Sequence, residues 1–358
     1  METPQRIHLR DLSLDQLRHA ILETGEPEYR YRQLCRWLYG RLAGSLSEMT
    51  DLPVSLRESL SAQYRVEAAR AVMAQFSRID GTRKYLFELD DGATIEAVAM
   101  SYERRTTLCV STQVGCPLDC TFCETATGRF RRNLTAGEIL DQVCVLKLDS
   151  GLADRRVNVV FMGMGEPLLN FDSLVLAIRT LNDPMGLNLG AKRITVSTSG
   201  FPDRIRKLAD EGVKCSLAVS LNASDDALRR KIMPKASRHT IEELLAAARY
   251  FVRHRGRRAT LEYVMISGVN MSDDDAVRLA RLSHGLPFKI NLIPYNPGRT
   301  GRFRRVSEEE IQRFVDLLLP QAPAVTIRRS RGADIDAACG QLWTKSLGKK
   351  DNPAEGAA

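Results

Sequence analysis

Three cysteines within eight residues are the feature of this sequence with the clearest chemical meaning. Cys116, Cys120 and Cys123 follow a C-x3-C-x2-C spacing. Three thiolates this close together can wrap one iron-sulfur cluster, but they leave one iron of a 4Fe-4S centre without a protein ligand. That iron is free to chelate the amino and carboxylate groups of S-adenosylmethionine, which holds the sulfonium close enough for one-electron cleavage.

A zinc site is the competing interpretation of the same cysteines. It would need a fourth ligand, either Cys109 or a histidine, because structural zinc is almost always four-coordinate. No histidine lies between His19 and His239, so the iron-sulfur interpretation is favoured. With Phe122 before the last cysteine, the spacing resembles the signature of radical S-adenosylmethionine enzymes.

A glycine-rich turn, Gly163-Met164-Gly165-Glu166-Pro167, follows the next expected strand. Its glycines would let the backbone approach a ligand closely, and its carbonyls and carboxylate can accept hydrogen bonds from an ammonium group. The turn resembles the superfamily's site for the amino group of S-adenosylmethionine. Together with residues that end later strands, the expected cofactor contacts are Gly165, Glu166, Ser197, Ser220, Leu221, Asn222 and Asn296.

Strand and helix patterns alternate from Thr106 onward, and they must position these residues. Apolar segments predict strands at 106–112, 158–163, 193–199, 215–221, 260–266, 289–294 and 325–330. Helices are expected between them, for example at 136–148, where Thr135 and Glu138 form a capping box, and at 272–283. This alternation predicts an α/β fold, a partial (β/α)6 TIM-like barrel of the radical S-adenosylmethionine type, with its chemistry at the C-terminal ends of the strands.

The residues before the barrel have a different pattern. Helical spacing of apolar residues runs from Leu9 to Tyr64, with expected helix starts at Ser13 and Glu28, and a strand-like region follows with a hairpin turn at 90–92. We therefore expect a small N-terminal helical accessory domain that binds RNA and a short β extension. The expected division is 1–65 for the helical domain, 66–100 for the β-rich connecting segment, 101–345 for the barrel core with its C-terminal loop, and 346–358 for a disordered tail.

The composition is that of an ordinary globular protein and excludes fibrous or largely disordered classes. Lysine and arginine number 52 against 44 acidic residues, a net charge of +8 that suggests a polyanionic partner. The sequence has neither the apolar core of a signal peptide at its start nor an apolar run of about 18 residues, so a soluble cytoplasmic protein is expected. Thiols stay reduced there, so the eight cysteines should be metal ligands, reactive thiols or core residues.

Several motifs in order carry a resemblance to one family. They are CVSTQVGCPLDCTFC, RRNLTAGEI, GMGEPLLN, VSTSG, EYVMISGVN, KINLIPYNP and RGADIDAACGQL. From about Glu28 to Leu342 the chain resembles the RlmN family, the dual-specificity RNA methyltransferases that form 2-methyladenosine in the peptidyl transferase centre of 23S ribosomal RNA and in transfer RNA. One departure is visible, because Asn222 stands where many relatives carry histidine.

The resemblance implies catalytic roles for two further cysteines and a carboxylate. Cys339 would be the methyl carrier, Cys109 the resolving thiol and Glu96 the proton acceptor. The residues alone would favour a purely structural role, in which both thiols are small buried hydrophobic side chains and the carboxylate is solvated. The remaining cysteines match no functional position and are expected in the core: Cys35, Cys144 and Cys215.

The implied mechanism answers a chemical difficulty, since C2 of adenine is too electron-poor to attack a sulfonium methyl. One S-adenosylmethionine methylates the Cys339 thiolate, a strong nucleophile. A second is cleaved to a 5'-deoxyadenosyl radical, which takes a hydrogen atom from the methylated cysteine, and the resulting methylene radical adds to C2. Loss of an electron and of the C2 proton to Glu96 lets Cys109 attack Cys339, which forms a transient disulfide and frees the methylated base.

The implied partners are 23S ribosomal RNA, transfer RNA and an electron donor of the flavodoxin or ferredoxin type, and the protein is expected to act as a monomer with no membrane. The target base must leave its stack to react. Basic clusters that could grip RNA phosphates are Arg129 with Arg131 and Arg132, 253–258, 299–305 and 328–331. Two alternatives stay open: a C8-methylating enzyme of the antibiotic-resistance type, and a non-catalytic protein that binds zinc and RNA.

Overall fold

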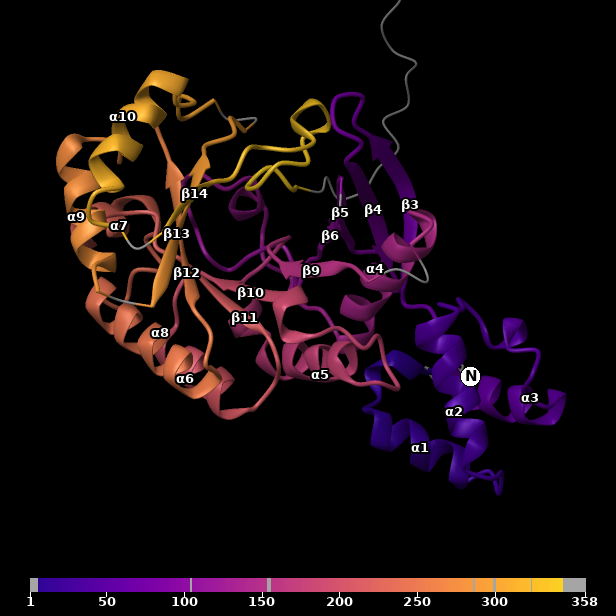
Figure 1. Cartoon of the computed structure of the whole chain (residues 1–358). Helices are drawn as coiled ribbons and strands as arrows, with labels where there is room; N and C mark the ends of the chain where they lie inside the picture. Colours follow the sequence, from indigo (N-terminus) through magenta and orange to yellow (C-terminus); the bar gives the residue numbers. More distant parts are fainter. Residues whose placement is uncertain are drawn as a thin grey trace, which may run out of the picture.

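The computed structural model of the chain describes residues 6–103, 105–152, 156–285, 287–298, 301–322 and 324–343. The expected tail at 346–358 lies outside these residues. Figure 1 shows an open barrel of strands with helices on its outside and a separate group of N-terminal helices below one edge. Within the described part of the chain, no helix is long and apolar enough to cross a membrane.

The N-terminal residues form the helices that the sequence predicts. The helices are α1 (Leu14–Leu22), α2 (Tyr29–Cys35) and α3 (Val54–Gln63). Ser13 caps α1 through a capping box with Gln16, as its position before the apolar pattern indicates. A short parallel pair, β1 (Ile7–His8) with β2 (Tyr64–Arg65), joins the two ends of this group.

The β extension continues the barrel sheet, which the sequence pattern did not predict. Its strands are β3 (Ala69–Phe76), β4 (Arg83–Leu89) and β5 (Thr94–Tyr102), all antiparallel, and the predicted turn at 90–92 joins the last two. Strand β5 then pairs with the first barrel strand, β6 (Arg105–Cys109). The described residues thus form one ten-stranded sheet in the order β14-β13-β12-β11-β10-β9-β6-β5-β4-β3.

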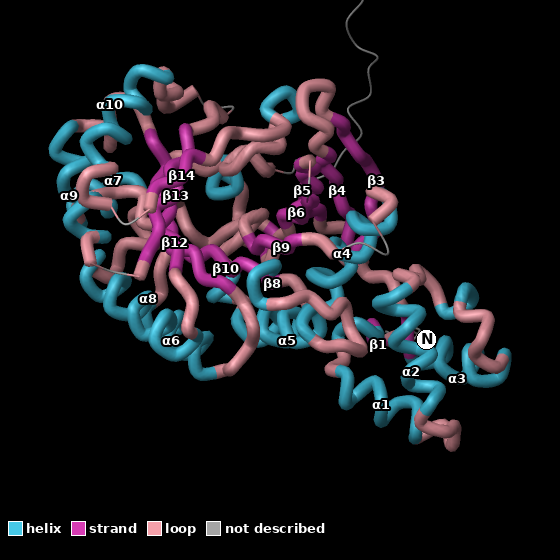
Figure 2. The backbone as a smooth tube through the Cα atoms, in the orientation of Figure 1, coloured by secondary structure: helices cyan, strands magenta, loops and turns pink. Residues whose placement is uncertain are grey.

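The barrel strands are parallel from β6 onward, and each predicted strand is confirmed to within a few residues. They are β9 (Asn158–Phe161), β10 (Ile194–Thr198), β11 (Ser216–Ser220), β12 (Ala259–Met265), β13 (Phe288–Pro294) and β14 (Val325–Ile327). The main helices between them are α4 (Ala136–Asp149), α5 (Phe171–Asn182), α6 (Pro202–Asp210), α8 (Ile241–Arg255), α9 (Asp273–Ser283) and α10 (Glu308–Leu318). Six strand-helix pairs followed by β14 confirm the predicted partial (β/α)6 barrel, and Figure 2 shows its strands as an open arc inside the helices.

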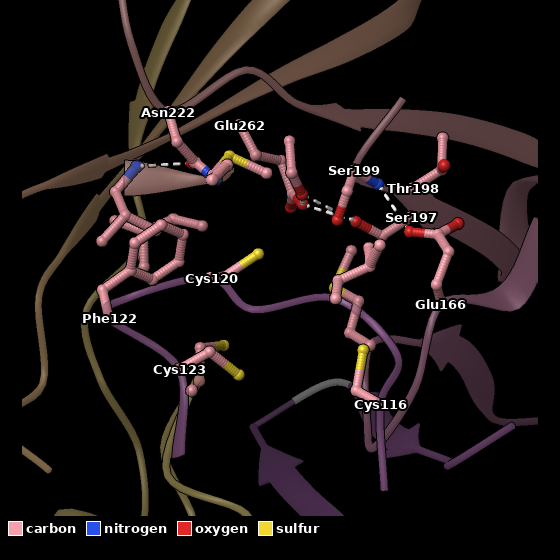
Figure 3. A pocket seen from close by; sticks show the side chains of 18 of the residues that line it. Cys116, Cys120, Phe122, Cys123, Glu166, Ser197, Thr198, Ser199, Asn222 and Glu262 are labelled. Carbon is pink, nitrogen blue, oxygen red and sulfur yellow. Dashed lines mark hydrogen bonds between the residues drawn. The ribbon is translucent and has the colours of Figure 1, made fainter. Parts of the chain in front are cut away.

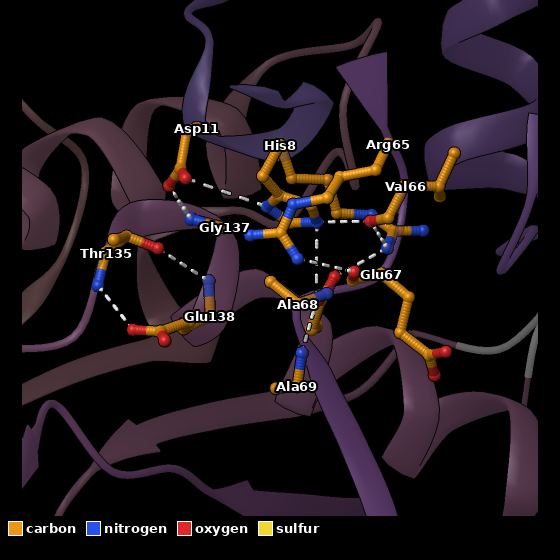
Figure 4. A network of polar contacts seen from close by, with 12 residues as sticks. His8, Asp11, Arg65, Val66, Glu67, Ala68, Ala69, Thr135, Gly137 and Glu138 are labelled. Carbon is orange, nitrogen blue, oxygen red and sulfur yellow. Dashed lines mark hydrogen bonds and ion pairs between the residues drawn. The ribbon is translucent and has the colours of Figure 1, made fainter. Parts of the chain in front are cut away.

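A buried polar network joins the N-terminal helices to helix α4. Arg10 donates to Asp141 on α4 at 2.5 Å and to the carbonyls of Leu38 and Ala43. Burial alone would raise the pKa of Asp141, but the charges of His8 and Arg10 outweigh it and hold that pKa at about 2. Figure 4 shows His8 and Asp11 of this network packed beside the start of α4.

Candidate active site

A cavity lies at the C-terminal ends of the barrel strands, and we name it the cluster cavity. The loop after β6 contributes Cys116, Cys120 and Cys123 to its lining, and the ends of β10 and β11 and the middle of β12 contribute polar side chains. Figure 3 shows the three cysteines facing the same space as Glu166, Ser197 and Glu262. The position agrees with the rule that barrel chemistry sits at this end of the strands.

The three cysteines line one cavity together, as the ligands of a single cluster must. In a 4Fe-4S cluster each cysteine binds a different iron, so the sulfur atoms stand farther apart than around one ion. Three cysteines around one cavity, with apolar Leu118 and Phe122 beside them, therefore fit a cluster with one open iron.

The glycine-rich turn approaches the segment after β6 more closely than a residue with a side chain would allow. At Gly165 φ is +99°, and a Cβ there would lie 2.5 Å from the Cβ of Gln113. The Gln113 side chain in turn accepts a hydrogen bond from the Glu166 backbone N–H at 2.8 Å. These contacts hold the turn against the loop that carries the cysteines.

Glu166 is almost fully buried, with 2% of its surface exposed. Its two oxygens accept hydrogen bonds from the backbone N–H groups of Ser199 at 2.8 Å and Leu168 at 3.1 Å. Burial raises the pKa of this carboxyl, and the N–H groups oppose that shift. A carboxylate oxygen has more than one acceptor position, so Glu166 keeps acceptor capacity toward the cavity that it lines.

Glu262 is a buried carboxylate in the cavity that sequence reasoning missed. It lies in the middle of β12 and accepts hydrogen bonds from the hydroxyls of Ser197 at 2.7 Å and Ser220 at 3.4 Å. The EYVMISGVN motif contained it, but its position in an apolar strand hid its role. The period-two alternation of a strand could have indicated it, because Thr260, Glu262 and Val264 all point inward.

The other predicted cofactor contacts divide into two groups. Asn222 lines the cavity, with φ of +58° and its side chain bonded to the Val264 N–H at 3.0 Å. Asn296 also lines it and donates to the carbonyl of Cys339 at 3.4 Å. Leu221 does not line it. Its side chain is fully buried in the hydrophobic core, because successive side chains of an extended segment point in opposite directions.

Cys109 and Cys339 lie far apart in the sequence but line one small cavity beside the first, which we name the thiol cavity. Cys109 ends β6, and burial raises the pKa of its thiol to about 12. Cys339 and Cys123 line the same cavity, so both thiols adjoin the cluster cysteines. The other cysteines predicted for the core are confirmed there: Cys35, Cys144 and Cys215.

Arg328 lies between the two cavities, whereas the sequence indicated only that it belongs to a basic cluster that could bind RNA phosphates. It follows β14 and lines both of them, and its guanidinium contacts the sulfur of Met162 at 3.3 Å. Its pKa is raised, mainly by the electrostatic interaction with the nearby Cys339 side chain. The same positive charge lowers the pKa of Cys109 against the effect of burial. A fixed cation thus lies beside both thiols.

The loop that carries Cys339 is held in place from two sides, and we name residues 332–343 the carrier loop. On the barrel side, Glu124 donates its backbone N–H to the Gly340 carbonyl at 2.8 Å, and the Thr125 hydroxyl donates to Leu342 at 2.7 Å. On the other side, the hairpin between β3 and β4 binds Asp334. The Ser77 hydroxyl and the Arg78 N–H donate to its carboxylate at 2.7 and 3.0 Å.

Glu96 lies on β5, close to the end of the carrier loop. Its carboxylate is 3.3 Å from the Lys84 ammonium and accepts the Trp343 N–H at 2.9 Å. Burial raises the pKa of Glu96, while Lys84 and the Trp343 N–H act in the opposite direction. Glu96 is not among the side chains that line either cavity, but Leu342, next to Trp343, lines the thiol cavity.

Some residues of the predicted basic clusters have structural partners instead of a free surface. Arg132 binds Glu138 and Asp91, each at 2.8 Å, and links the start of α4 to the β4–β5 turn. Arg255 donates to the carbonyls of Gly212 and Val213. Arg299 lies outside the described residues.

Comparisons with known proteins agree with this site. Residues 110–280 match the model of the radical S-adenosylmethionine superfamily, and residues 7–66 match that of the ribosomal RNA large subunit methyltransferase N-terminal domain. The dual-specificity RNA methyltransferase RlmN of Geobacter sulfurreducens is 46% identical over 95% of this chain and 92% of its own, and that of Syntrophotalea carbinolica is 43% identical over 96% and 92%. The crystal structure of a radical S-adenosylmethionine methyltransferase from Sphaerobacter thermophilus superposes with a TM-score of 0.90 at 45% identity and covers 94% of this chain and 99% of that one.

Proposed function

Because this chain belongs to the RlmN family of radical S-adenosylmethionine RNA methyltransferases, we propose that it methylates C2 of an adenosine in 23S ribosomal RNA and in transfer RNA. The proposal rests on the observation that two thiols line the same cavity. Cys109 and Cys339 come from opposite ends of the barrel region, and the cavity they share also contains the cluster cysteine Cys123. A methyltransferase with a one-step transfer would need neither thiol.

The chain's own residues account for both cofactors. Cys116, Cys120 and Cys123 would hold a 4Fe-4S cluster, and S-adenosylmethionine would be held in the rest of the cluster cavity by Gly165, Glu166, Ser197, Ser220, Asn222 and Asn296. When bound, the two supply a methyl group and one-electron cleavage chemistry, with two S-adenosylmethionine molecules per turnover. The neutral hydroxyls of Ser197 and Ser220 and the carboxylate of Glu262 are suited to orient the polar groups of this ligand.

The remaining steps belong to three side chains. The Cys339 sulfur accepts the methyl group, and Asn296 and Glu124 hold its loop through the backbone. Glu96 accepts the C2 proton, for which its raised pKa suits it better than an exposed carboxylate. The Cys109 thiolate, which the charge of Arg328 favours, attacks the Cys339 sulfur and forms a disulfide. The bond from this sulfur to the methylene carbon on C2 breaks, the carbon keeps the electron pair and takes up a proton, and the base leaves with a methyl group.

The proposal includes the surroundings in which the protein works. A flavodoxin- or ferredoxin-type donor supplies electrons to the cluster, the protein acts as a monomer, and it functions in the cytoplasm. A reducing compartment is needed because the disulfide between Cys109 and Cys339 has to be reduced after each turnover.

The proposed activity is tested by nucleoside mass spectrometry of 23S RNA from a strain that lacks its own enzyme and is complemented with this chain. We expect 2-methyladenosine to return, and transfer RNA from the same cells to contain it too. The Cys339→Ala variant is the matched control and should restore none. If 8-methyladenosine appears instead, the chain belongs functionally with the C8-methylating enzymes, and if neither appears, the proposal is wrong.

The role of the second thiol has a separate test. In the Cys109→Ala variant, the covalent link between Cys339 and the base has no resolving nucleophile, so a protein-RNA adduct should accumulate. The adduct would migrate as a larger species on a denaturing gel and disappear on ribonuclease treatment. The Cys215→Ala variant changes a buried thiol that lines neither cavity and should give no adduct. Free migration of the Cys109→Ala protein would argue against the assigned role.

A further inference from the structure

A third cavity lies at the opposite end of the barrel from the cluster cavity, and we name it the N-terminal cavity. Its lining comes from inward-facing positions of the strands β6 to β14, from the β3–β4 hairpin and the end of β5, and from residues 328–331 after β14. Its volume is about 830 Å³, toward the upper end of the range of about 300–1,000 Å³ for ligand sites. It shares Met162, Glu262 and Arg328 with the cluster cavity. The two cavities therefore meet at these three side chains.

The N-terminal cavity also adjoins the reacting thiols. Tyr102 and Arg328 line both this cavity and the thiol cavity. Along β13, Lys289 lies at the N-terminal cavity and Ile293 at the thiol cavity. Four residues at about 3.3 Å each separate these levels by roughly 13 Å. A base that reaches Cys339 from the N-terminal end of the barrel must therefore pass into the interior of the barrel along this distance.

Most inward-facing positions of the N-terminal cavity are polar, with Val160, Ala218 and Ile327 as the apolar exceptions on its strands, although closed barrels fill the same positions with branched apolar side chains. The polar positions are Thr107, Asn158, Thr195, Thr260, Asn291 and Thr326. Each of these side chains can form hydrogen bonds with water or with a polar ligand. This half of the barrel is therefore an open polar lumen and not a packed core.

The charge of the N-terminal cavity selects an anion. Of the described residues that line it, seven are lysine or arginine and two are carboxylates. Both carboxylates are engaged, since Glu262 accepts from Ser197 at 2.7 Å and Asp80 accepts the Gly332 N–H at 2.9 Å. By contrast, no described carboxylate forms an ion pair with the rim residues Arg105, Lys192, Arg193 and Lys289. This rim therefore carries positive charge that no ion pair within the described part of the chain neutralises.

We propose that the substrate RNA binds across the N-terminal end of the barrel, with its phosphates on the rim formed by Arg105, Lys192, Arg193 and Lys289. The target nucleotide leaves its stack and enters the lumen toward Arg328, where Cys339 is within reach. The inference rests on the proposed function and adds to it the site where the RNA binds. It also explains why the lumen is polar, because a sugar and a base edge have to pass through it.

The test compares two double charge reversals of equal size. The rim variant is Lys192→Glu with Lys289→Glu, and the control is Lys207→Glu with Arg281→Glu, which lie exposed on the outer helices α6 and α9 and belong to none of the predicted basic clusters. The probe is a fluorescently labelled 23S RNA fragment that contains the target adenosine, and its binding to the cluster-loaded protein is measured by anisotropy over a range of potassium chloride concentrations. Methylation of Cys339 without RNA, measured by intact-protein mass, reports whether the active site is intact.

We expect the rim variant to bind the fragment about 10- to 100-fold more weakly at about 0.1 M salt, and the slope of log affinity against log salt to fall by about one to two units. Cys339 methylation should stay within twofold of the wild type in both variants. The Lys192→Gln with Lys289→Gln variant removes charge without adding any. Its decrease in log affinity for the fragment should be about half of that in the rim variant.

Equal losses in the rim and control variants would show that only net charge matters and would overturn the inference, as would unchanged binding in the rim variant. A rim variant that no longer methylates Cys339 has a damaged active site, and the glutamine variant then decides the question by the same criteria. Wild-type protein that neither binds nor methylates the fragment would instead contradict the proposed function, so the two failures are distinguishable.

Discussion

Two charged side chains inside the barrel show how much the site depends on single residues. Glu262 accepts hydrogen bonds from two serines, and Arg328 lies beside both reactive thiols. Burying an unpaired charge costs several kcal/mol, and in each case neighbouring groups of opposite charge or hydrogen-bonding capacity offset that cost. The two side chains also mark the boundary between the cluster cavity and the N-terminal cavity.

The pH dependence of methylation provides a test of Glu96 as the proton acceptor. The group must be ionised to take a proton, and burial raises its pKa while Lys84, 3.3 Å away, lowers it. Replacing this lysine in Lys84→Met removes the opposing charge, so the pKa of Glu96 should rise further. The acidic limb of the pH-rate profile for RNA methylation should move to higher pH, with little change at the alkaline end.

The adjacent position supplies the control for this prediction. Arg83 is next to Lys84 on β4 but pairs with Asp149, away from Glu96. The Arg83→Met variant should therefore keep the wild-type profile. If Lys84→Met leaves the acidic limb in place, Glu96 is not the group whose ionisation limits the reaction.

At the level of elements, the β extension has a task that its sequence does not reveal. The β3–β4 hairpin binds Asp334 of the carrier loop, and β5 supplies Glu96. The connecting segment thus contacts the proposed catalytic groups through its β3–β4 turn and through β5. Strand β5 pairs with β6, which ends in Cys109, so Glu96 and Cys109, the proposed proton acceptor and resolving thiol, lie on neighbouring strands of one sheet.

The contact between the N-terminal residues and helix α4 predicts an unusual effect of a glycine substitution. Alanine favours helices over glycine by about 1 kcal/mol, so Gly137→Ala in α4 would normally stabilise. Here the added Cβ would overlap the ring of His8, and the Gly137 N–H already binds Asp11 at 2.7 Å. We expect the free energy of unfolding to fall by about 1–3 kcal/mol instead, measured by denaturant titration.

A second glycine makes this comparison specific. Gly190 has φ of −71° and no atom near its Cβ position. The Gly190→Ala variant should be neutral or stabilising by less than about 1 kcal/mol. Equal stabilities of the two variants would mean that residues 6–11 do not pack on α4 as described.

For the molecule as a whole, the buried network around Arg10 and Asp141 predicts that the N-terminal helices and the barrel unfold together. The chain has two tryptophans, Trp37 among the N-terminal helices and Trp343 in the carrier loop. In variants that retain one of them, made by Trp37→Phe or Trp343→Phe, fluorescence should report the same denaturant midpoint. Asp141→Ala leaves Arg10 buried without its partner, at a cost of about 3–5 kcal/mol, and should separate the two midpoints.

Different midpoints in the single-tryptophan variants of the otherwise native chain would contradict this coupling. The substitution Asp172→Ala serves as control, because that carboxylate is 97% exposed and makes only a long contact with Lys207. It should leave both midpoints unchanged.

Local patterns in the sequence determined much of this protein. The cysteine spacing, the strand and helix periods and the capping boxes at Ser13 and Thr135 each depend on residues close together in the chain, and the structure agrees with them. The motif resemblance also named the family, which the comparisons confirm. Residue types were sufficient here because a cluster-binding loop and a helix start are encoded within a few positions.

Only the tertiary structure decided which distant groups meet. Arg328 lies beside Cys339, Glu262 accepts hydrogen bonds from two serines, and the β3–β4 hairpin binds Asp334. These contacts depend on the order of the strands and on how far the barrel stays open. The open, polar N-terminal end of the barrel is likewise invisible in sequence, because its rim combines single basic residues from separate strands. Local patterns report which face of an element is apolar, whereas side chains from different strands come together only when the whole sheet has formed.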